Sequence, residues 1–182
     1  MLNVPNVITL IRVLLIPVIA VLLVRRQYAP ALAVFMAAAI SDFADGAIAR
    51  HYRIVSEFGA RLDPIADKLT MFTATVLLAW QSQLPLWLAA AIVLRDVVIA
   101  GGAIAYRLLV GHVEMAPTRL SKVNTALEFA ALAGALAQAA GLLDARAWLP
   151  PLFAVVFATV IVSGAQYVWA WSWKAAAARR NA

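Results

Sequence analysis

The sequence predicts an all-α membrane protein, a bundle of six transmembrane helices with both termini on the cytoplasmic side. Hydrophobic residues make up 65% of the 182 residues, and the mean hydropathy is +0.88. Soluble domains contain roughly 45–50% apolar residues. Six apolar stretches each approach the length of about 20 residues that a spanning helix needs. Basic residues and tryptophans gather near the ends of these stretches, as they do at membrane interfaces.

The length of the chain predicts a single integral-membrane domain over residues 1–182. No cysteine is present, so disulfides and thiolate metal sites are excluded. A formal net charge of +6 would suggest a nucleic-acid partner in a soluble protein. In a membrane protein, Lys and Arg are expected on the cytoplasmic flanks, so we predict no nucleic-acid partner.

The predicted spans cover residues 7–24, 30–49, 59–80, 84–107, 124–143 and 148–173. The first span resembles a signal peptide in length, but it lacks a small-residue cleavage site and further spans follow, so we expect it in the mature protein. Pro5 precedes it and suits the first turn of a helix. The second and third spans are joined by the short loop 51–58, which predicts antiparallel neighbours.

The later spans carry more polar residues. The fourth contains Arg95 and Asp96, an adjacent pair of opposite charges that is expected to face the interior of a bundle. This pair either has a function or only holds helices together. Arg119 and Lys122 open the fifth span on the predicted cytoplasmic side. After the sixth span, the alanine tract 175–178 is predicted to continue the helix toward a basic C-terminus near anionic headgroups.

Basic residues orient the bundle, because cytoplasmic loops carry an excess of Lys and Arg. With the N-terminus inside, the cytoplasmic set is Arg50, Arg53, Arg107, Arg119, Lys122, Lys174, Arg179 and Arg180. The outside set is Arg25, Arg26 and Arg146. The majority predicts an N-in, C-in topology, with the two arginines of the first hairpin opposing it.

Four aspartates interrupt the apolar sequence where the second span ends and the third begins. They are Asp42, Asp45, Asp63 and Asp67. The first two are three residues apart and the last two are four apart, and either spacing puts a pair on one helical face. An ionised Asp in a span costs about 2.5–3.5 kcal/mol near the bilayer centre and less toward the interface. Such a cluster predicts a compensating cation, or else a structural ion network with Arg50, Arg61 and Lys68.

The types of ligand restrict the ion. Carboxylates without Cys favour the hard divalent cations Mg²⁺ and Mn²⁺ over Zn²⁺. We interpret His51 and His112 as solvated residues at a basic interface. Gly46 and Gly59 each weaken a helix by roughly 0.5–1 kcal/mol relative to Ala. Their presence favours a close-fitting ligand beside the backbone over a purely structural network.

The full motif is Asp42-x-x-Asp45-Gly46-x-x-Ala49-Arg50, eight residues, Gly59-x-x-x-Asp63-x-x-x-Asp67. It resembles the signature of the CDP-alcohol phosphotransferases at every specified position. The opening of the chain, Asn3-Val-Pro5-Asn6-Val-Ile-Thr9-Leu-Ile-Arg12, also looks like the start of these enzymes. Six spans are what the members of this family have.

The resemblance implies an enzyme that takes a CDP-linked lipid, displaces CMP and joins the phosphatidyl group to an alcohol. Asp42, Asp45 and Asp63 would hold two divalent ions, and Asp67 would complete the metal site and act as general base. The CDP pocket would be shaped by Gly46, Ala49, Arg50 and Gly59. The chemistry fits these roles, since metal ions neutralise two phosphates and a carboxylate can accept the proton of the attacking hydroxyl. The resemblance also implies a homodimer.

Two further stretches point to the acceptor. Residues 95–99 and 121–126 resemble the CMP-forming, eukaryotic-type cardiolipin synthases more than the phosphatidylglycerolphosphate synthases, which usually show Arg-Glu in place of Arg95-Asp96. This implies transfer from CDP-diacylglycerol to phosphatidylglycerol, giving cardiolipin and CMP. Glycerol 3-phosphate is the alternative acceptor. Both acceptors carry phosphate, which Arg119 and Lys122 are suited to bind, unless these two residues are only markers of the cytoplasmic side.

Two other classes of protein fit the sequence less well. A small secondary transporter could use buried acids for ion coupling, but no internal repeat is visible and the acids cluster at one predicted membrane face. A non-catalytic scaffold would have no reason to keep four acids and two glycines. We therefore expect an enzyme of the bacterial inner (cytoplasmic) membrane, embedded in membrane lipids, with its active site facing the cytoplasm.

Overall fold

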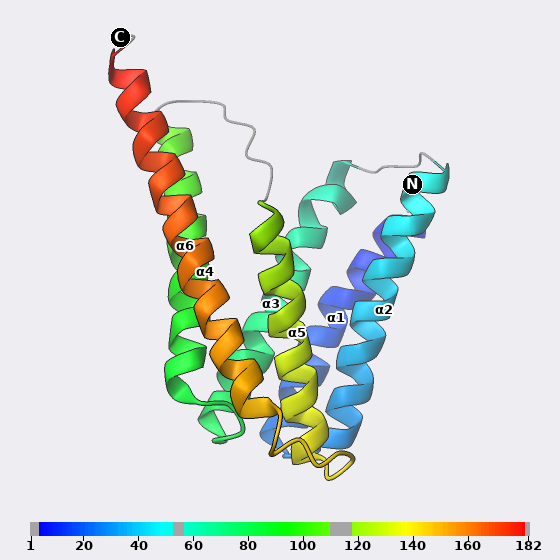
Figure 1. The fold of residues 1–182 in the computed structure, drawn as a ribbon. Coiled ribbons are helices and arrows are strands. Elements are labelled where there is room, and N and C mark those ends of the chain that lie inside the picture. The colour runs from blue at the N-terminus through cyan, green and yellow to red at the C-terminus, as the bar shows by residue number, and fades with distance from the viewer. Residues whose placement is uncertain (1–3, 53–56, 110–117, 181–182) are drawn as a thin grey trace. The chain divides into compact units, whose positions relative to one another are not determined.

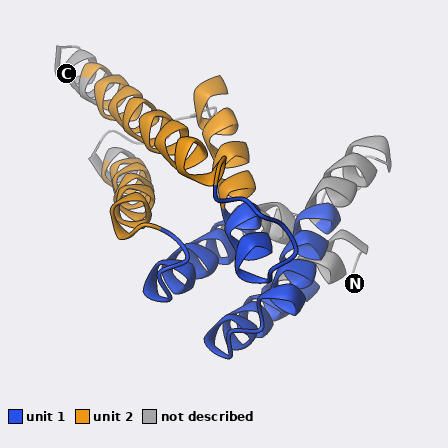
Figure 2. Ribbon diagram, turned by 60° about the horizontal axis from the view of Figure 1, so that its bottom comes forward, with its two compact units in different colours: residues 1–84, 132–146 blue, residues 85–131, 147–182 orange. Residues whose placement is uncertain are grey.

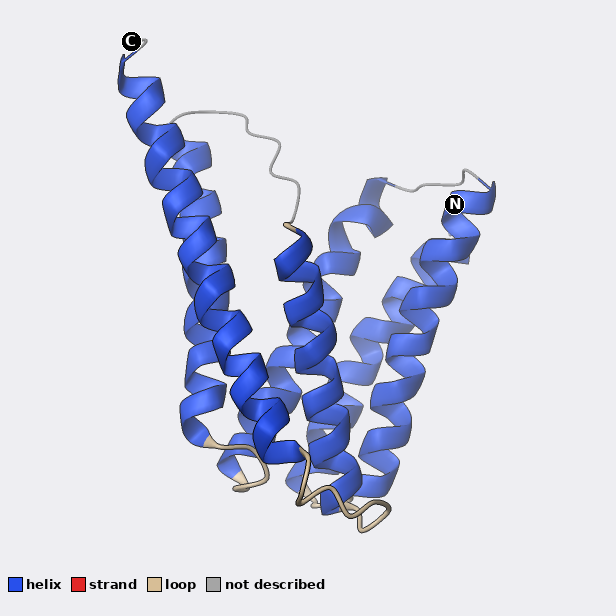
Figure 3. Cartoon of the chain, in the orientation of Figure 1, coloured by secondary structure: helices blue, strands red, loops and turns tan. Residues whose placement is uncertain are grey.

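The structure of the chain is a computed structural model that describes residues 4–52, 57–109 and 118–180. Within these ranges, the side chains of residues 4–10, 12, 42–65, 106–109, 172 and 174–180 lie outside the description. All regular elements of the described residues are α-helices (Figures 1 and 3), which confirms the all-α prediction. They are α1 (Val4–Val24), α2 (Tyr28–Tyr52), α3 (Glu57–Trp80), α4 (Leu86–Leu109), α5 (Arg119–Ala139) and α6 (Leu149–Arg180).

The chain divides into two compact units (Figure 2). Unit 1 comprises residues 1–84 and 132–146, and unit 2 comprises residues 85–131 and 147–182, so the division falls within α5. In unit 1, α1 packs against both α2 and α3. In unit 2, α4 packs against α6. Ile19 and Leu23 of α1 and Leu88 of α4 are among the fully buried apolar side chains of these helices.

Three helices end in the same hydrogen-bonded turn, which needs a residue with positive φ just beyond the helix. After α5 this residue is Gly141, with φ of 70°, and the N–H of Leu142 donates to the carbonyl of Ala137 at 3.0 Å. Arg26 and Ser82 hold the same place after α1 and α3, with φ of 56° and 59°. This turn stops α5 at Ala139, short of the predicted end at residue 143.

Helix starts also depend on local hydrogen bonds. The hydroxyl of Thr118 accepts a hydrogen bond from the N–H of Ser121 at 3.1 Å, and this N-cap begins α5 at Arg119. The predicted span began later, at residue 124. Helix α6 continues to Arg180, as predicted for the alanine tract. Helix α1 has Pro5 in its first turn, also as predicted.

Two described stretches are long and apolar enough to cross a membrane, Leu86–Ala105 in α4 and Leu149–Trp171 in α6. Val13–Val24 and Tyr28–Ser41 are shorter apolar stretches. Many large apolar side chains on these helices are exposed, including Leu94 of α4. Apolar surface of this kind suits contact with lipid.

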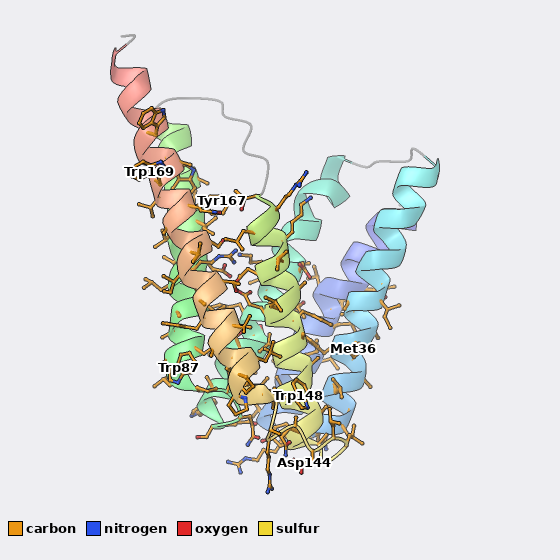
Figure 4. All side chains as sticks on the ribbon, viewed as in Figure 1. Met36, Trp87, Asp144, Trp148, Tyr167 and Trp169 are labelled. Atoms are coloured by element: carbon orange, nitrogen blue, oxygen red, sulfur yellow. The ribbon has the colours of Figure 1, made fainter. Side chains whose placement is uncertain are left out.

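Aromatic side chains lie toward both ends of the α4–α6 pair (Figure 4). Trp87 and Trp148 lie at one end, and Tyr167 and Trp169 lie toward the other. The ring of Trp87 meets Phe157 edge-on, with the ring centroids 5.2 Å apart and an interplanar angle of 86°. This distribution is typical of the aromatic belts found at both interfaces of a membrane.

Gly102 of α4 allows the indole of Trp171 to lie against the α4 backbone. A Cβ atom at Gly102 would be 1.5 Å from Cζ3 of Trp171. We therefore expect Gly102→Ala to displace this indole, which also contacts Tyr167 with ring centroids 5.7 Å apart. Such overpacking costs about 1–3 kcal/mol, and thermal unfolding in detergent should show a lower apparent Tm.

Gly101→Ala is the matched control, because a Cβ at Gly101 would meet nothing within 4 Å. Alanine stabilises an exposed helical position by up to about 1 kcal/mol relative to glycine. The apparent Tm of this variant should be unchanged or raised. Equal effects of the two substitutions would show that the indole does not depend on the missing Cβ of Gly102.

Candidate active site

The acidic motif lies on two helices. Asp42 and Asp45 are both in α2, and Asp63 and Asp67 are both in α3. Because each pair lies within one continuous helix, the three-residue and four-residue spacings place each pair on one helical face, as predicted. The side chains of the first three aspartates lie outside the description. The same holds for the predicted CDP positions Gly46, Ala49, Arg50 and Gly59.

Asp67 is the aspartate of the motif whose side chain is described, and it is exposed. It follows Ala66, which begins a buried stripe on α3 that continues through Thr70, Ala74 and Leu78. The hydroxyl of Thr70 donates to the carbonyl of Ala66 at 2.9 Å, so its polarity is satisfied within the helix. Because these four residues define the buried face of α3, Asp67 lies outside that face and its side chain is exposed.

Helices α2 and α3 both pack against α1. The predicted approach of α2 to α3 at the acidic motif falls on residues 42–65, whose side chains lie outside the description. No group of three or more His, Asp or Glu side chains that could hold a metal occurs among the described residues. The meeting of the four carboxylates thus stays a prediction.

The predicted acceptor residues lie at the start of α5. Arg119 is the first residue of the helix and Lys122 follows one turn later, and both side chains are exposed. Thr118 caps this turn through Ser121. A helix N-terminus carries partial positive charge, so the two cationic side chains and the helix end all favour an anion.

A buried polar cluster in unit 2 contains the arginine that the sequence singled out. The Arg95 side chain is 4% exposed. Its Nη1 donates to Asp96 Oδ1 at 3.0 Å and lies 3.8 Å from Oε1 of Glu128. Its Nη2 donates to the hydroxyl oxygens of Ser121 and Ser163 at 3.0 and 3.3 Å. The guanidinium therefore connects α4, α5 and α6.

The cluster continues along α5. Asn124, which is fully buried, donates from its side-chain amide to Glu128. The hydroxyl of Thr159 in α6 donates to Asn124 Oδ1 at 2.7 Å. Sequence reasoning missed Glu128, Asn124 and Ser163 as members of this cluster. The available signal was periodicity, since Asn124 and Glu128 are four residues apart on one face of an apolar helix.

A family model described as CDP-alcohol phosphatidyltransferase matches residues 2–171. A cardiolipin synthase (CMP-forming)/mitochondrial hydrolase fusion protein of Schizosaccharomyces pombe is 35% identical over an alignment of 178 residues, with 90% of this chain and 30% of that protein covered. The cardiolipin synthase (CMP-forming) of Homo sapiens is 32% identical, over 74% of this chain and 50% of its own length.

Relatives with another name match as well. The CDP-diacylglycerol–glycerol-3-phosphate 3-phosphatidyltransferase of Rickettsia prowazekii is 35% identical over an alignment of 133 residues, with 71% of this chain and 72% of that protein covered. The chain spans 30% and 45% of the lengths of two cardiolipin synthase relatives, from Schizosaccharomyces pombe and Drosophila melanogaster. The names of the relatives divide between the two acceptors that the sequence left open.

Proposed function

We propose, on the premise that this chain belongs to the CDP-alcohol phosphatidyltransferase family, that it is a membrane enzyme which transfers a phosphatidyl group from CDP-diacylglycerol to an alcohol and releases CMP. The observation that carries this proposal is the eight-position motif on α2 and α3. The family model supports it, because the match extends over residues 2–171 and so includes the whole motif.

Asp42, Asp45, Asp63 and Asp67 are proposed to hold two divalent ions, Mg²⁺ or Mn²⁺. The donor set fits such ions, because it is made of carboxylate oxygens on helical faces and the chain has no cysteine. When bound, the ions would neutralise the pyrophosphate and stabilise the leaving CMP. Without a cation, four ionised aspartates within membrane helices would repel one another.

The other motif residues shape the reaction around the CDP group. Gly46, Ala49 and Gly59 leave room for the nucleotide beside the backbone, and the guanidinium of Arg50 is suited to a phosphate oxygen. Asp67 accepts the proton of the attacking hydroxyl as the new phosphorus–oxygen bond forms. Its exposure allows an acceptor to reach it.

For the acceptor, the proposal is phosphatidylglycerol, so that the product is cardiolipin. The Arg95-Asp96 pair and residues 121–126 favour this choice, and two relatives named cardiolipin synthase match most of the chain. Glycerol 3-phosphate is the second candidate, favoured by the relative from Rickettsia prowazekii. Arg119 and Lys122 are proposed to bind the acceptor phosphate in either case.

The test offers both acceptors to the purified enzyme with CDP-diacylglycerol and identifies the lipid products by mass spectrometry. Phosphatidylglycerol should be used in preference, and cardiolipin should accumulate. If glycerol 3-phosphate gave phosphatidylglycerolphosphate efficiently while phosphatidylglycerol gave no cardiolipin, the second candidate would replace the first.

Lys122→Ala should weaken use of the acceptor more than binding of the CDP-lipid. The lost contact with a phosphate is worth about 1.5–3 kcal/mol, so the KM for the acceptor should rise by at least about tenfold. Arg146→Ala is the control, because this exposed residue is predicted on the opposite membrane face and its side chain is 85% exposed. Equal effects of Lys122→Ala on both substrates would remove Lys122 from the acceptor site.

The membrane arrangement is part of the proposal. Six spans in a single domain, both termini in the cytoplasm, a homodimer and a bacterial inner membrane are the arrangement we propose. The two long apolar helices and the exposed apolar surface support a membrane location. The relatives come from bacteria and eukaryotes, so they favour no particular membrane.

A further inference from the structure

The first half of α5 is joined to the rest of unit 2 through side chains. Helices α4 and α6 pack closely along their backbones, and polar side chains link the first half of α5 to both of them. The links are polar: Ser121 and Glu128 to Arg95 of α4, and Asn124 to Thr159 of α6. These polar contacts tie the buried face of this half of α5 to both neighbouring helices.

Arg95 is at the centre of these contacts. Buried residues Leu88 and Ile92 precede it on the same face of α4, and Val156 and Val160 precede Ser163 on α6. Arg95 and Ser163 thus each follow a row of buried apolar residues on their own helix, and their side chains meet beyond these rows. The guanidinium is planar and rigid. Its Nη1, which faces the carboxylates, and its Nη2, which faces the serine hydroxyls, therefore hold these groups at a fixed separation.

Three of the four N–H groups on Nη1 and Nη2 donate hydrogen bonds within the cluster. Each Nη carries two N–H groups. Nη1 faces Asp96 and Glu128, and Nη2 faces Ser121 and Ser163. Only Nε lacks an acceptor among the described residues. This arrangement suits a structural connection and leaves the guanidinium without a free pair of donors for a phosphate.

We infer that Arg95 is a positioning residue: by holding Ser121, it sets the place of the first turn of α5, which presents Arg119 and Lys122 to the acceptor phosphate. Ser121 belongs to this same turn, and Thr118 caps it. A shift of Ser121 would move both basic side chains together. The inference rests on the acceptor role proposed above for Arg119 and Lys122.

The experiment measures the place of α5 directly and independently of activity. The chain has no cysteine, so spin labels on introduced cysteines at Val123 of α5 and Ile161 of α6 would be the only ones present. These positions are 51% and 53% exposed. Labelled protein is diluted with unlabelled protein, so that pulsed electron spin resonance reports distances within one chain.

Two kinds of variant loosen the connection. Ser121→Ala removes one hydroxyl, and Ser121→Thr restores it as the conservative rescue. Arg95→Met with Glu128→Leu removes both buried charges at similar volume, a change that often preserves folding. Thr125→Ala is the matched control, because the hydroxyl of Thr125 donates only to the carbonyl of Ser121 in its own helix among the described contacts, at 3.1 Å.

We expect the distance distribution between the labels to broaden or shift in Ser121→Ala and in the double variant, and to stay unchanged in Ser121→Thr and Thr125→Ala. In Ser121→Ala and in the double variant, the KM for phosphatidylglycerol should also rise about tenfold. This is the loss of affinity expected when one hydrogen bond to a charged group is removed. The KM for CDP-diacylglycerol should not change.

Unchanged distances in the double variant would overturn the inference, even if the acceptor KM rose, since Arg95 would then act by direct contact. Altered distances with an unchanged acceptor KM would also overturn it, because Arg95 would then only hold helices together. If the unmodified enzyme used neither acceptor, the proposed function would fail while the distances still tested the connection.

Discussion

Asp42→Ala, Asp45→Ala and Asp63→Ala should each lower turnover of CDP-diacylglycerol by at least about 10³-fold. Metal ions contribute several kcal/mol of charge stabilisation at a reacting phosphate, and each 1.36 kcal/mol changes the rate tenfold. Removing one carboxylate ligand should displace an ion or loosen its position. The measurement is initial CMP release by purified variants that have been shown to insert into membranes and to keep their helical content.

Asp144→Ala is the control for these variants. Asp144 lies in the loop before α6, its side chain is 81% exposed, and its contact with Arg146 spans 4.0 Å. Exposed ion pairs of this kind contribute about 0–1 kcal/mol, so activity should be retained. A near-normal rate in any one of the three motif variants would remove that residue from the metal site.

Asp67→Asn should lower turnover by about 10²–10⁴-fold, the usual contribution of general acid–base catalysis, while much of the affinity for CDP-diacylglycerol is kept. The carboxamide is polar and similar in shape to the carboxylate, but it cannot accept a proton at working pH. The check compares turnover with the equilibrium binding of CDP-diacylglycerol to the same variant.

Asp144→Asn controls for the loss of one negative charge elsewhere in the chain, and it should change neither quantity. A loss of CDP-lipid affinity as large as the loss of turnover in Asp67→Asn would indicate that Asp67 is chiefly a metal ligand. The general base would then have to be sought among other residues.

Much of the fold could be predicted from hydropathy, because long apolar segments bounded by basic and aromatic residues have few alternatives to a helix. The ends of the helices were less predictable. Arg26 and Ser82 occupy positive-φ positions that usually hold glycine, so no sequence signal marked them. The early start of α5 depends on the N-cap hydroxyl of Thr118. Many other Ser and Thr residues in the chain could equally have been predicted as N-caps.

The candidate site shows the same contrast. The aspartates and glycines of the motif are recognisable because the chemistry needs particular residue types at fixed spacing along two helices. The partners of Arg95 come from three helices, and Ser163 is 68 residues away from it in the sequence. Contacts between residues of different helices depend on how those helices pack. The spacing of residues within one helix does not reveal this packing.

The central claim is tested most directly by following CMP release from CDP-diacylglycerol and phosphatidylglycerol by the purified protein, with and without divalent cations. We expect CMP and cardiolipin to appear in equal amounts, to vanish with a chelator and to return with Mg²⁺ or Mn²⁺. Full activity after complete removal of metal, or no CMP release with any alcohol acceptor in the presence of metal, would contradict the account.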